Sequence, residues 1–151
     1  FIRLKLVPHV ANTYPGFEMV CAPDPAGFMK QQLNELTLVD ALRNAGFTCV
    51  KPPSNKPEYR IQAVERLLAQ QTDGEAMYIV DPSCRMIKGF KHGYRYKKKR
   101  NGELEDKPEK NEYSHIHDAN QYADSILDLQ FRGSTAAAHS REVKRVRYVY
   151  T

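Results

Sequence analysis

The sequence predicts an α/β domain in which short apolar strands alternate with amphipathic helices. Three short apolar runs, at residues 17–22, 47–50 and 76–80, stop near a proline or an aspartate, as buried strands commonly do. Apolar residues spaced three and four positions apart lie between and after these runs, which is the pattern of helices packed on a core. This order favours a mixed sheet with several parallel strands and helices on its faces.

The first half of the chain carries clear start and stop signals for helices. Residues 1–13 are expected to form the end of a helix, which Pro15-Gly16 terminates. Thr37 is the expected N-cap of a second helix, and Gly46 is its expected C-terminal cap. A third helix is expected to begin at residues 54–57. Its apolar stripe comprises Ile61, Val64, Leu67 and Leu68.

The second half is expected to contain a short helix, a hairpin and a long helix. The short helix covers residues 83–90, and the hairpin covers residues 94–110 around the turn Asn101-Gly102. Ser114 is the expected cap of the last helix. The inward-facing residues of that helix are predicted to be Ile116, Ala119, Ala123, Ile126 and Leu127.

The length and composition are those of one globular domain. The 151 residues are 41% hydrophobic and 27% charged, with no apolar run of membrane-spanning length and no signal peptide at the start. We expect residues 1–132 to form the domain and residues 133–151 to form a linker and tail, because residues 133–140 are small and polar. Residues 1–7 have the pattern of an element already under way, so we expect further sequence upstream.

The three cysteines argue against a zinc ribbon. Cys21, Cys49 and Cys84 are widely spaced, and the sequence has no CxxC pair. Cys21 and Cys49 lie in apolar runs, where a buried, reduced thiol is the simplest interpretation. Such thiols fit a reducing compartment.

Positive charge is concentrated in one segment. The formal net charge is +5 and the pI is about 9.1, which is compatible with a polyanionic partner. Residues 85–100 contain eight Lys or Arg and no acid, and an acidic stretch follows the turn at Asn101-Gly102. A solvated hairpin would also explain this run, but a surface that contacts phosphates explains it better. The expected DNA-binding residues are Arg95, Lys97, Lys98, Lys99 and Arg100.

Two aspartates follow predicted strands, where sites form in α/β sheets. Pro23 and Pro25 restrict the backbone on both sides of Asp24, which makes Asp24 the stronger candidate for a functional carboxylate. An Asx turn that merely ends the strand is the alternative for Asp24. Asp81 fits that alternative better, because Asp81 or Ser83 could cap the next helix.

The segment Tyr113 to Ala119 supplies the second candidate carboxylate. His115, Asp118 and Tyr122 share one face of the predicted helix, beside its apolar face. A carboxylate there needs a cation, and a divalent metal ion is one solution. Favourable placement near the helix N-terminus is the alternative explanation for Asp118. A zinc site on His115 and His117 is excluded, because the two side chains would point about 200° apart on a helix.

Several motifs occur in the order found in one known family. They are Asp24-Pro25-Ala26-Gly27, the segment from Asp40 to Gly46, Asn55 with Arg60 to Val64, Asp73-Gly74, Asp81 to Cys84, Gly93 to Tyr96, and Pro108 to Ala119. Across residues 1–130 this order and spacing resembles the nuclease domain of the terminase large subunit of tailed phages.

The resemblance implies an RNase H-like fold, a mixed sheet flanked by helices, of which this chain would be the C-terminal part without the first strands. It implies an endonuclease that cuts double-stranded phage DNA concatemers with two Mg²⁺ or Mn²⁺ ions. Asp24 and Asp118 match two of the family's catalytic carboxylates and would hold metal. The family's other essential aspartate lies on a first strand, upstream of the helix with which this chain begins, and has no counterpart here.

The family also implies partners: DNA, a terminase ATPase domain in the same polypeptide, the terminase small subunit and the portal protein, in the host cytoplasm during phage assembly. His115 could orient a ligand or carry a proton, and Lys110 could neutralise the scissile phosphate, although both could be structural. Arg60 is expected to pair with an acidic residue inside the fold. Two alternatives stay open: another RNase H-like nuclease, of the resolvase or transposase type, and a non-catalytic DNA-binding or docking module.

Overall fold

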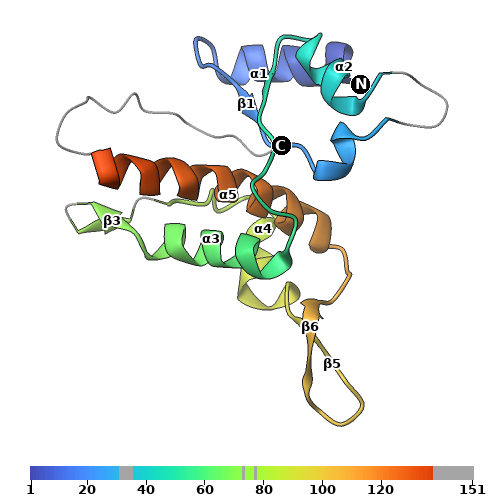
Figure 1. Ribbon diagram of the computed structural model, residues 1–151, viewed down its shortest axis with the longest axis vertical. Helices are drawn as coiled ribbons and strands as arrows, with labels where there is room; N and C mark the ends of the chain where they lie inside the picture. Colours follow the sequence, from blue (N-terminus) through green and yellow to red (C-terminus); the bar gives the residue numbers. More distant parts are fainter. Residues whose placement is uncertain (31–35, 73, 77, 138–151) are drawn as a thin grey trace.

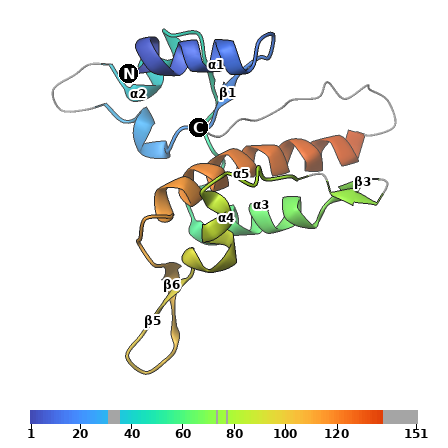
Figure 2. The ribbon, with the colours of Figure 1, turned by 180° about the vertical axis from the view of Figure 1, so that it is seen from behind.

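The structure is a computed structural model, and it describes residues 1–30, 36–72, 74–76 and 78–137. The fold is mixed α/β, and about half of the described residues are helical. The elements lie in two layers (Figures 1 and 2): α1, α2 and β1 form one, α3, α4 and α5 form the other, and the β5–β6 hairpin projects from the second. The predicted mixed α/β class is therefore confirmed, but the described strands form three separate two-stranded sheets rather than one mixed sheet flanked by helices.

The first layer is built on a short parallel pair of strands. Strand β1 (Val20–Cys21) pairs with β2 (Thr48–Cys49), with Val20 opposite Thr48 and Cys21 opposite Cys49. A π-helical turn η1 (Ile2–Leu6) leads into α1 (Val7–Thr13), so the predicted first helix is present. The core of this layer consists of Val10, Leu42 and Phe47.

Helix α2 (Leu38–Arg43) forms where its capping signals predict it. The Thr37 hydroxyl accepts a hydrogen bond from the Asp40 backbone N–H at 3.0 Å, and the Asp40 carboxylate accepts one from the Thr37 N–H at 2.9 Å. This reciprocal capping satisfies two backbone donors at the helix start. Gly46 has φ +95°, the left-handed conformation that the helix end requires and that glycine adopts at little cost.

The second layer is a pair of long helices, α3 (Pro57–Ala69) and α5 (Ser114–Ala137), which lie side by side and run in the same direction in both views (Figures 1 and 2). Arg60 accordingly pairs with Asp118, and Arg66 with Asp128. The α3 face against α5 is partly apolar, with Ala63, Val64 and Leu67 buried. The buried face of α5 is largely polar, contrary to the sequence pattern, and the predicted inward residue Ala119 is exposed. Its buried polar side chains are Ser114, His117, Asn120, Gln121, Asp124, Ser125 and Asp128.

Hydrogen bonds explain how these polar side chains are buried. Arg66 of α3 donates to both carboxylate oxygens of Asp128, at 2.9 and 2.8 Å. Tyr78 donates to Asn120 at 2.8 Å, and Asn120 in turn donates to Asp124 at 2.7 Å. Polar groups buried with such partners avoid most of the cost of desolvation.

The predicted strand at residues 76–80 is wrong. Strands β3 (Gln71–Thr72) and β4 (Glu75–Ala76) form a small antiparallel hairpin of their own, and residues 78–81 have no regular structure. Tyr78 makes its hydrogen bond to α5 rather than to a neighbouring strand. Asp81 therefore does not end a strand; it accepts hydrogen bonds from the Ser83 N–H and hydroxyl, which is the predicted Asx turn. Neither residue caps the next helix, whose N-cap is Arg85.

The predicted basic hairpin is present. After α4 (Met86–Lys88) and the π-helical turn η3 (Gly89–Gly93), strand β5 (Tyr96–Lys98) pairs with β6 (Leu104–Pro108) across a turn in which Gly102 has φ +86°.

The expected linker is helical at its start. Helix α5 continues through Ala137, so residues 133–137 extend the helix, while residues 138–151 lie outside the described residues. Within the part of the chain that the structure describes, no helix combines the length and apolar character needed to cross a membrane.

Candidate functional site

Tyr122 of α5 is the centre of the candidate site. The ring is buried, and its hydroxyl donates a hydrogen bond to Asn55 Oδ1 at 2.7 Å. Burial raises the pKa of Tyr122, the charge of Arg60 lowers it, and the carboxylates of Asp24 and Asp118 raise it again. Asp24 and Asp118, far apart in the sequence, thus act on the same phenol. The structure brings the two predicted catalytic carboxylates into one neighbourhood.

Asp118 is neutralised by two cations. Its Oδ1 lies 3.4 Å from Arg60 Nη2, and its Oδ2 accepts a hydrogen bond from Lys110 Nζ at 2.8 Å. The Asp118 side chain is only 20% exposed, so a charge partner is needed there. The sequence-based expectation that Arg60 pairs with an acid inside the fold is confirmed. We refer to Asp24, Asn55, Arg60, Lys110, Asp118 and Tyr122 as the Asp118 cluster.

The two cations beside Asp118 differ in mobility. The Arg60 side chain is 7% exposed and its guanidinium carbon lies 4.4 Å from the centre of the Tyr122 ring, a cation–π contact. Among the described residues, Arg60 Nε and Nη1 are buried and have no hydrogen-bond partner. Lys110 is 76% exposed and is attached to the cluster only through its ammonium group. Arg60 is therefore a fixed counter-ion and Lys110 an exchangeable one.

Asp24 sits at the start of the short 3-10 helix η2 (Pro25–Phe28), three residues beyond β1. Its Oδ1 accepts a hydrogen bond from the Ala26 N–H at 2.8 Å. Asp24 therefore has the local capping role that the Asx-turn alternative predicts. Asp24 is also exposed, and its carboxylate has further lone pairs that the cap does not use, so it could still bind a ligand.

The two histidines of the helix have opposite environments. The His115 side chain is exposed and, within the described residues, forms no hydrogen bond or ion pair. His117 is buried between Tyr94, which stacks on it at 4.5 Å, and Phe90, which meets it edge-on at 4.8 Å. Burial lowers the pKa of His117, which favours its neutral form. One zinc ion could not take both side chains, which agrees with the helical geometry argued from the sequence.

Sequence reasoning missed the role of His117 and its neighbour Gly89. A Cβ atom on Gly89 would overlap Nε2 of the His117 ring, so only glycine lets the ring approach the η3 backbone. The aromatic residues that follow Gly89 in the sequence were the available signal, because Phe90 and Tyr94 surround the ring.

The described residues do not show a complete metal site. No group of three His, Cys, Asp or Glu side chains among them is arranged to hold an ion. Asp24 and Asp118 offer carboxylate oxygens, the ligands that Mg²⁺ and Mn²⁺ prefer. Two carboxylates alone do not make the two-metal site that the family resemblance implies.

The basic run is largely paired across the hairpin. Arg95 lies 3.1 Å from Glu109, Lys97 lies 3.1 Å from Glu105, and Lys99 lies 3.7 Å from Glu103. The acids that follow the turn therefore compensate the cations that precede it, which the sequence run taken alone conceals. Neither Lys98 nor Arg100 has an ion pair with another described residue. Seven cations against four acids still leave residues 94–110 positive.

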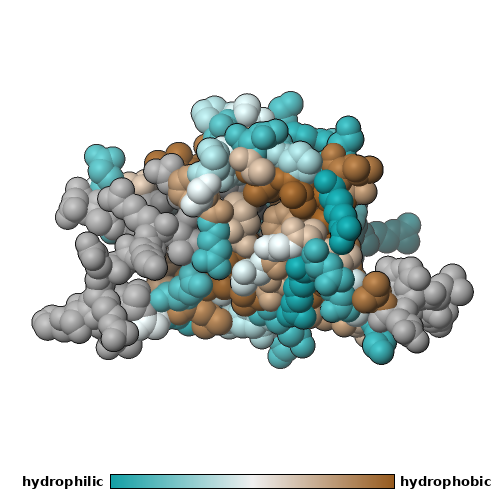
Figure 3. All heavy atoms as spheres, turned by 90° about the horizontal axis from the view of Figure 1, so that it is seen from above, coloured by the Kyte–Doolittle hydropathy of each residue, from teal (hydrophilic) through white to brown (hydrophobic). Residues whose placement is uncertain are grey.

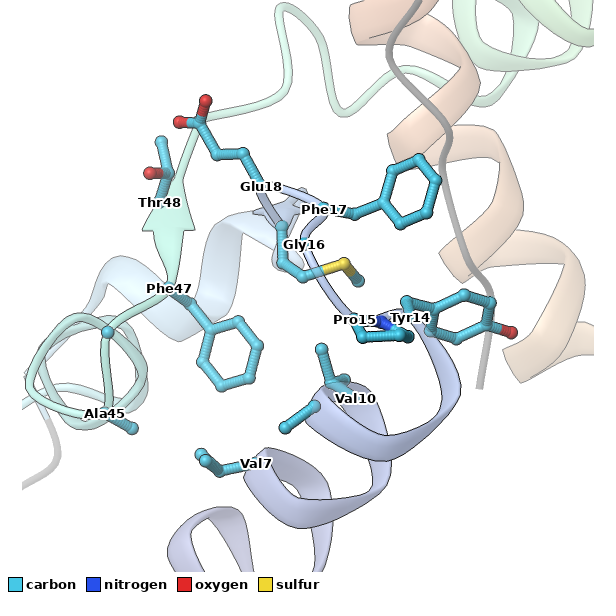
Figure 4. Close-up of a pocket in the computed structure, with 13 residues that line it drawn as sticks. Val7, Val10, Tyr14, Pro15, Gly16, Phe17, Glu18, Ala45, Phe47 and Thr48 are labelled. Carbon is cyan, nitrogen blue, oxygen red and sulfur yellow. The ribbon is translucent and has the colours of Figure 1, made fainter.

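An apolar groove of about 500 Å³ lies in the first layer, between α1 and the segments at residues 14–19 and 45–48. Phe47 lies across the groove from Val7 and Val10 of α1 (Figure 4). Seen from above, apolar residues are exposed among polar ones (Figure 3). Glu18 is the one charged residue among those that line the groove, so its chemistry differs from that of the Asp118 cluster.

Comparisons with protein-family models, with curated proteins and with solved structures find no match for this chain. What the protein does must therefore follow from the chemistry of the Asp118 cluster and of the hairpin.

Proposed function

We propose that this chain is part of a metal-dependent endonuclease that cuts double-stranded DNA, related to the terminase large subunit nuclease and its RNase H-like fold. The observation that carries the proposal is the convergence of Asp24 and Asp118 on Tyr122. Asn55, Arg60 and Lys110 belong to the motifs that resemble the family, and they join the same cluster. A purely structural acid would not require such convergence of separate motifs.

The cluster has the groups that phosphodiester hydrolysis uses. A divalent ion supplies Lewis acidity and an activated water when bound. Asp24 and Asp118 are the residues that would hold it. Lys110 can release Asp118 Oδ2 by side-chain rotation, because its ammonium group is exposed, and it can then neutralise a phosphate. Arg60 keeps Asp118 oriented throughout, because it is buried against Tyr122.

The hairpin supplies DNA affinity away from the reacting bond. It projects from the second layer (Figure 1), and its unpaired cations Lys98 and Arg100 lie next to the turn. Phosphate contacts of this kind hold DNA without reading its sequence. The proposal includes the family's setting, in which an ATPase domain, a small subunit and a portal protein act with the nuclease in the host cytoplasm.

Neutralising single carboxylates tests the proposal. This chain alone should cleave DNA poorly or not at all, because it lacks the family's first-strand aspartate. In a longer chain that includes that aspartate, Asp24→Asn and Asp118→Asn should each reduce Mg²⁺- or Mn²⁺-dependent cleavage of duplex DNA by at least about 100-fold, because each removes a charged ligand and keeps its shape. Asp81→Asn is the matched control, since Asp81, like Asp24, precedes a proline, and its side chain bonds to Ser83 within the described residues. Circular dichroism should show an intact fold in all three variants. Full activity in either cluster variant would reject these carboxylates.

A second candidate function is a non-catalytic DNA-binding module. The lack of a third metal-binding side chain near the pair, among the described residues, favours it. Calorimetric titration with Mn²⁺ separates the two candidates, because the module would bind DNA through the hairpin without binding the metal. A resolvase-type nuclease would instead prefer branched DNA junctions over linear duplexes in the same cleavage assay.

A further inference from the structure

Cys21 and Cys49 lie directly opposite each other on the parallel strands β1 and β2. Neighbouring strands are about 4.8 Å apart, which is within the Cα separation of roughly 4.4–6.8 Å that disulfides require. Residues paired in this way on parallel strands project to the same face of the sheet. Both thiols are free and half-buried, and they pack against the core of Val10, Leu42 and Phe47.

The two thiols also affect each other's ionisation. Burial, together with the charge and hydrogen bonding of Cys49, raises the pKa of Cys21 to about 11. Burial raises the pKa of Cys49 too, but the charge of Arg43 and a hydrogen bond from Cys21 act in the opposite direction. Cys49 therefore forms its thiolate more readily than Cys21 does. The sequence conceals this pair, because the cysteines are far apart and odd in number.

We propose that Cys21 and Cys49 form a redox-active dithiol, which a small disulfide such as oxidised glutathione converts into an intramolecular disulfide. The inference rests on the strand register and does not depend on the proposed nuclease function.

The conversion is two successive thiol–disulfide exchanges. The Cys49 thiolate attacks one sulfur of oxidised glutathione, forming a mixed disulfide and releasing one glutathione thiolate. Cys21 loses its proton to solvent and attacks the Cys49 sulfur, which forms the Cys21–Cys49 bond and releases the second glutathione. The protein loses two electrons and two protons, and one oxidised glutathione becomes two reduced glutathiones. In a reducing compartment the same equilibrium keeps both thiols reduced.

The position of the pair links it to the Asp118 cluster. Cys21 ends strand β1, and the chain continues from it to Asp24. Cys49 ends strand β2, and the chain continues from it to Asn55, which accepts a hydrogen bond from Tyr122. A bond between the strands would fix the start of both segments. Closing a chain loop of this length should raise Tm by roughly 5 °C or more in the oxidised form.

The test treats the protein with oxidised glutathione and maps disulfides by mass spectrometry of proteolytic peptides. We expect loss of two hydrogens per chain, a Cys21–Cys49 peptide pair, and a rate that rises with pH from 7 to 9, because more thiolate forms. A Cys84→Ser variant should behave identically, whereas Cys21→Ser should stop at a mixed disulfide on Cys49. A persistent mixed disulfide in the unsubstituted protein, or a disulfide that involves Cys84, would overturn the inference, and neither result depends on how the serine variants fold.

Discussion

Replacing Gly89 with alanine should destabilise the fold, because the new methyl group would overlap the imidazole of His117. The added Cβ would overlap the van der Waals sphere of Nε2 and lie 2.7 Å from Cδ2. His117 occupies the first turns of α5, one residue before Asp118. The substitution therefore probes how the helix that carries the Asp118 cluster is held against η3.

The magnitude follows from how little the ring can move. Tyr94 stacks on the His117 ring with an interplanar angle of 14°, and Phe90 contacts the ring edge-on. The ring can therefore move away from the new Cβ only if these packed aromatic rings are displaced. Overpacking of this kind costs about 1–3 kcal/mol. Gly89 has φ −62° and ψ −50°, so alanine would recover up to ~1 kcal/mol of helix propensity. The net loss should be about 1–2 kcal/mol, or a fall in Tm of roughly 3–8 °C.

Urea unfolding followed by circular dichroism measures this loss. Gly133→Ala is the matched control, because a Cβ there meets nothing within 4 Å and the residue lies in α5. That variant should be stabilised by up to ~1 kcal/mol. In a His117→Ala background, Gly89→Ala should no longer destabilise. Equal effects of the two glycine substitutions would refute the packing of His117 against Gly89.

Two further predictions concern charge. The double variant Lys98→Ala/Arg100→Ala should weaken binding to all DNA sequences. The slope of log K against log salt concentration should become shallower by about 0.9 per lost phosphate contact. The control variant Lys97→Ala/Lys99→Ala should change this slope less, because those lysines are paired with glutamates. Equal slopes for the two variants in salt titrations would contradict the prediction. Asp128→Asn should cost about 1–3 kcal/mol at pH 7. Hydrogen bonds from arginine lower the pKa of Asp128, so this stabilisation is present above the unfolded pKa of about 3.9 and is lost as pH falls below it. An unfolding series from pH 7 to 3 should show the two proteins converging.

Local signals in the sequence predicted the elements whose formation is decided locally. The capping residues Thr37 and Asp40, with Gly46 beyond them, determine α2 through hydrogen bonds within a few residues. The turn at Asn101-Gly102 determines the hairpin in the same way. The pairing of Arg60 with an acid was also foreseeable, because a charge on the buried face of a helix needs a partner.

Tertiary partners decided what the sequence could not predict. The apolar run at residues 76–80 has the composition of a strand, yet Tyr78 uses its hydroxyl on α5. The apolar periodicity of α5 placed Ala119 inside, whereas Asp124 and Asp128 are buried because α3 and Tyr78 supply hydrogen bonds. Periodicity counts apolar residues and cannot register a polar side chain whose partner comes from a distant segment.

The arrangement of charges at Asp118 determines how a ligand could enter the candidate site. Removing Arg60 from its carboxylate would leave a buried guanidinium with still fewer partners, because two of its nitrogens already have none among the described residues. Releasing Lys110 costs less than releasing Arg60, because the Lys110 side chain is 76% exposed and the Arg60 side chain only 7%. Under the proposed function, Asp24 and Asp118 would hold a divalent cation, which would supply Lewis acidity. Lys110 would then be free to leave Oδ2 of Asp118 and neutralise the phosphate, while Arg60 would stay at Oδ1.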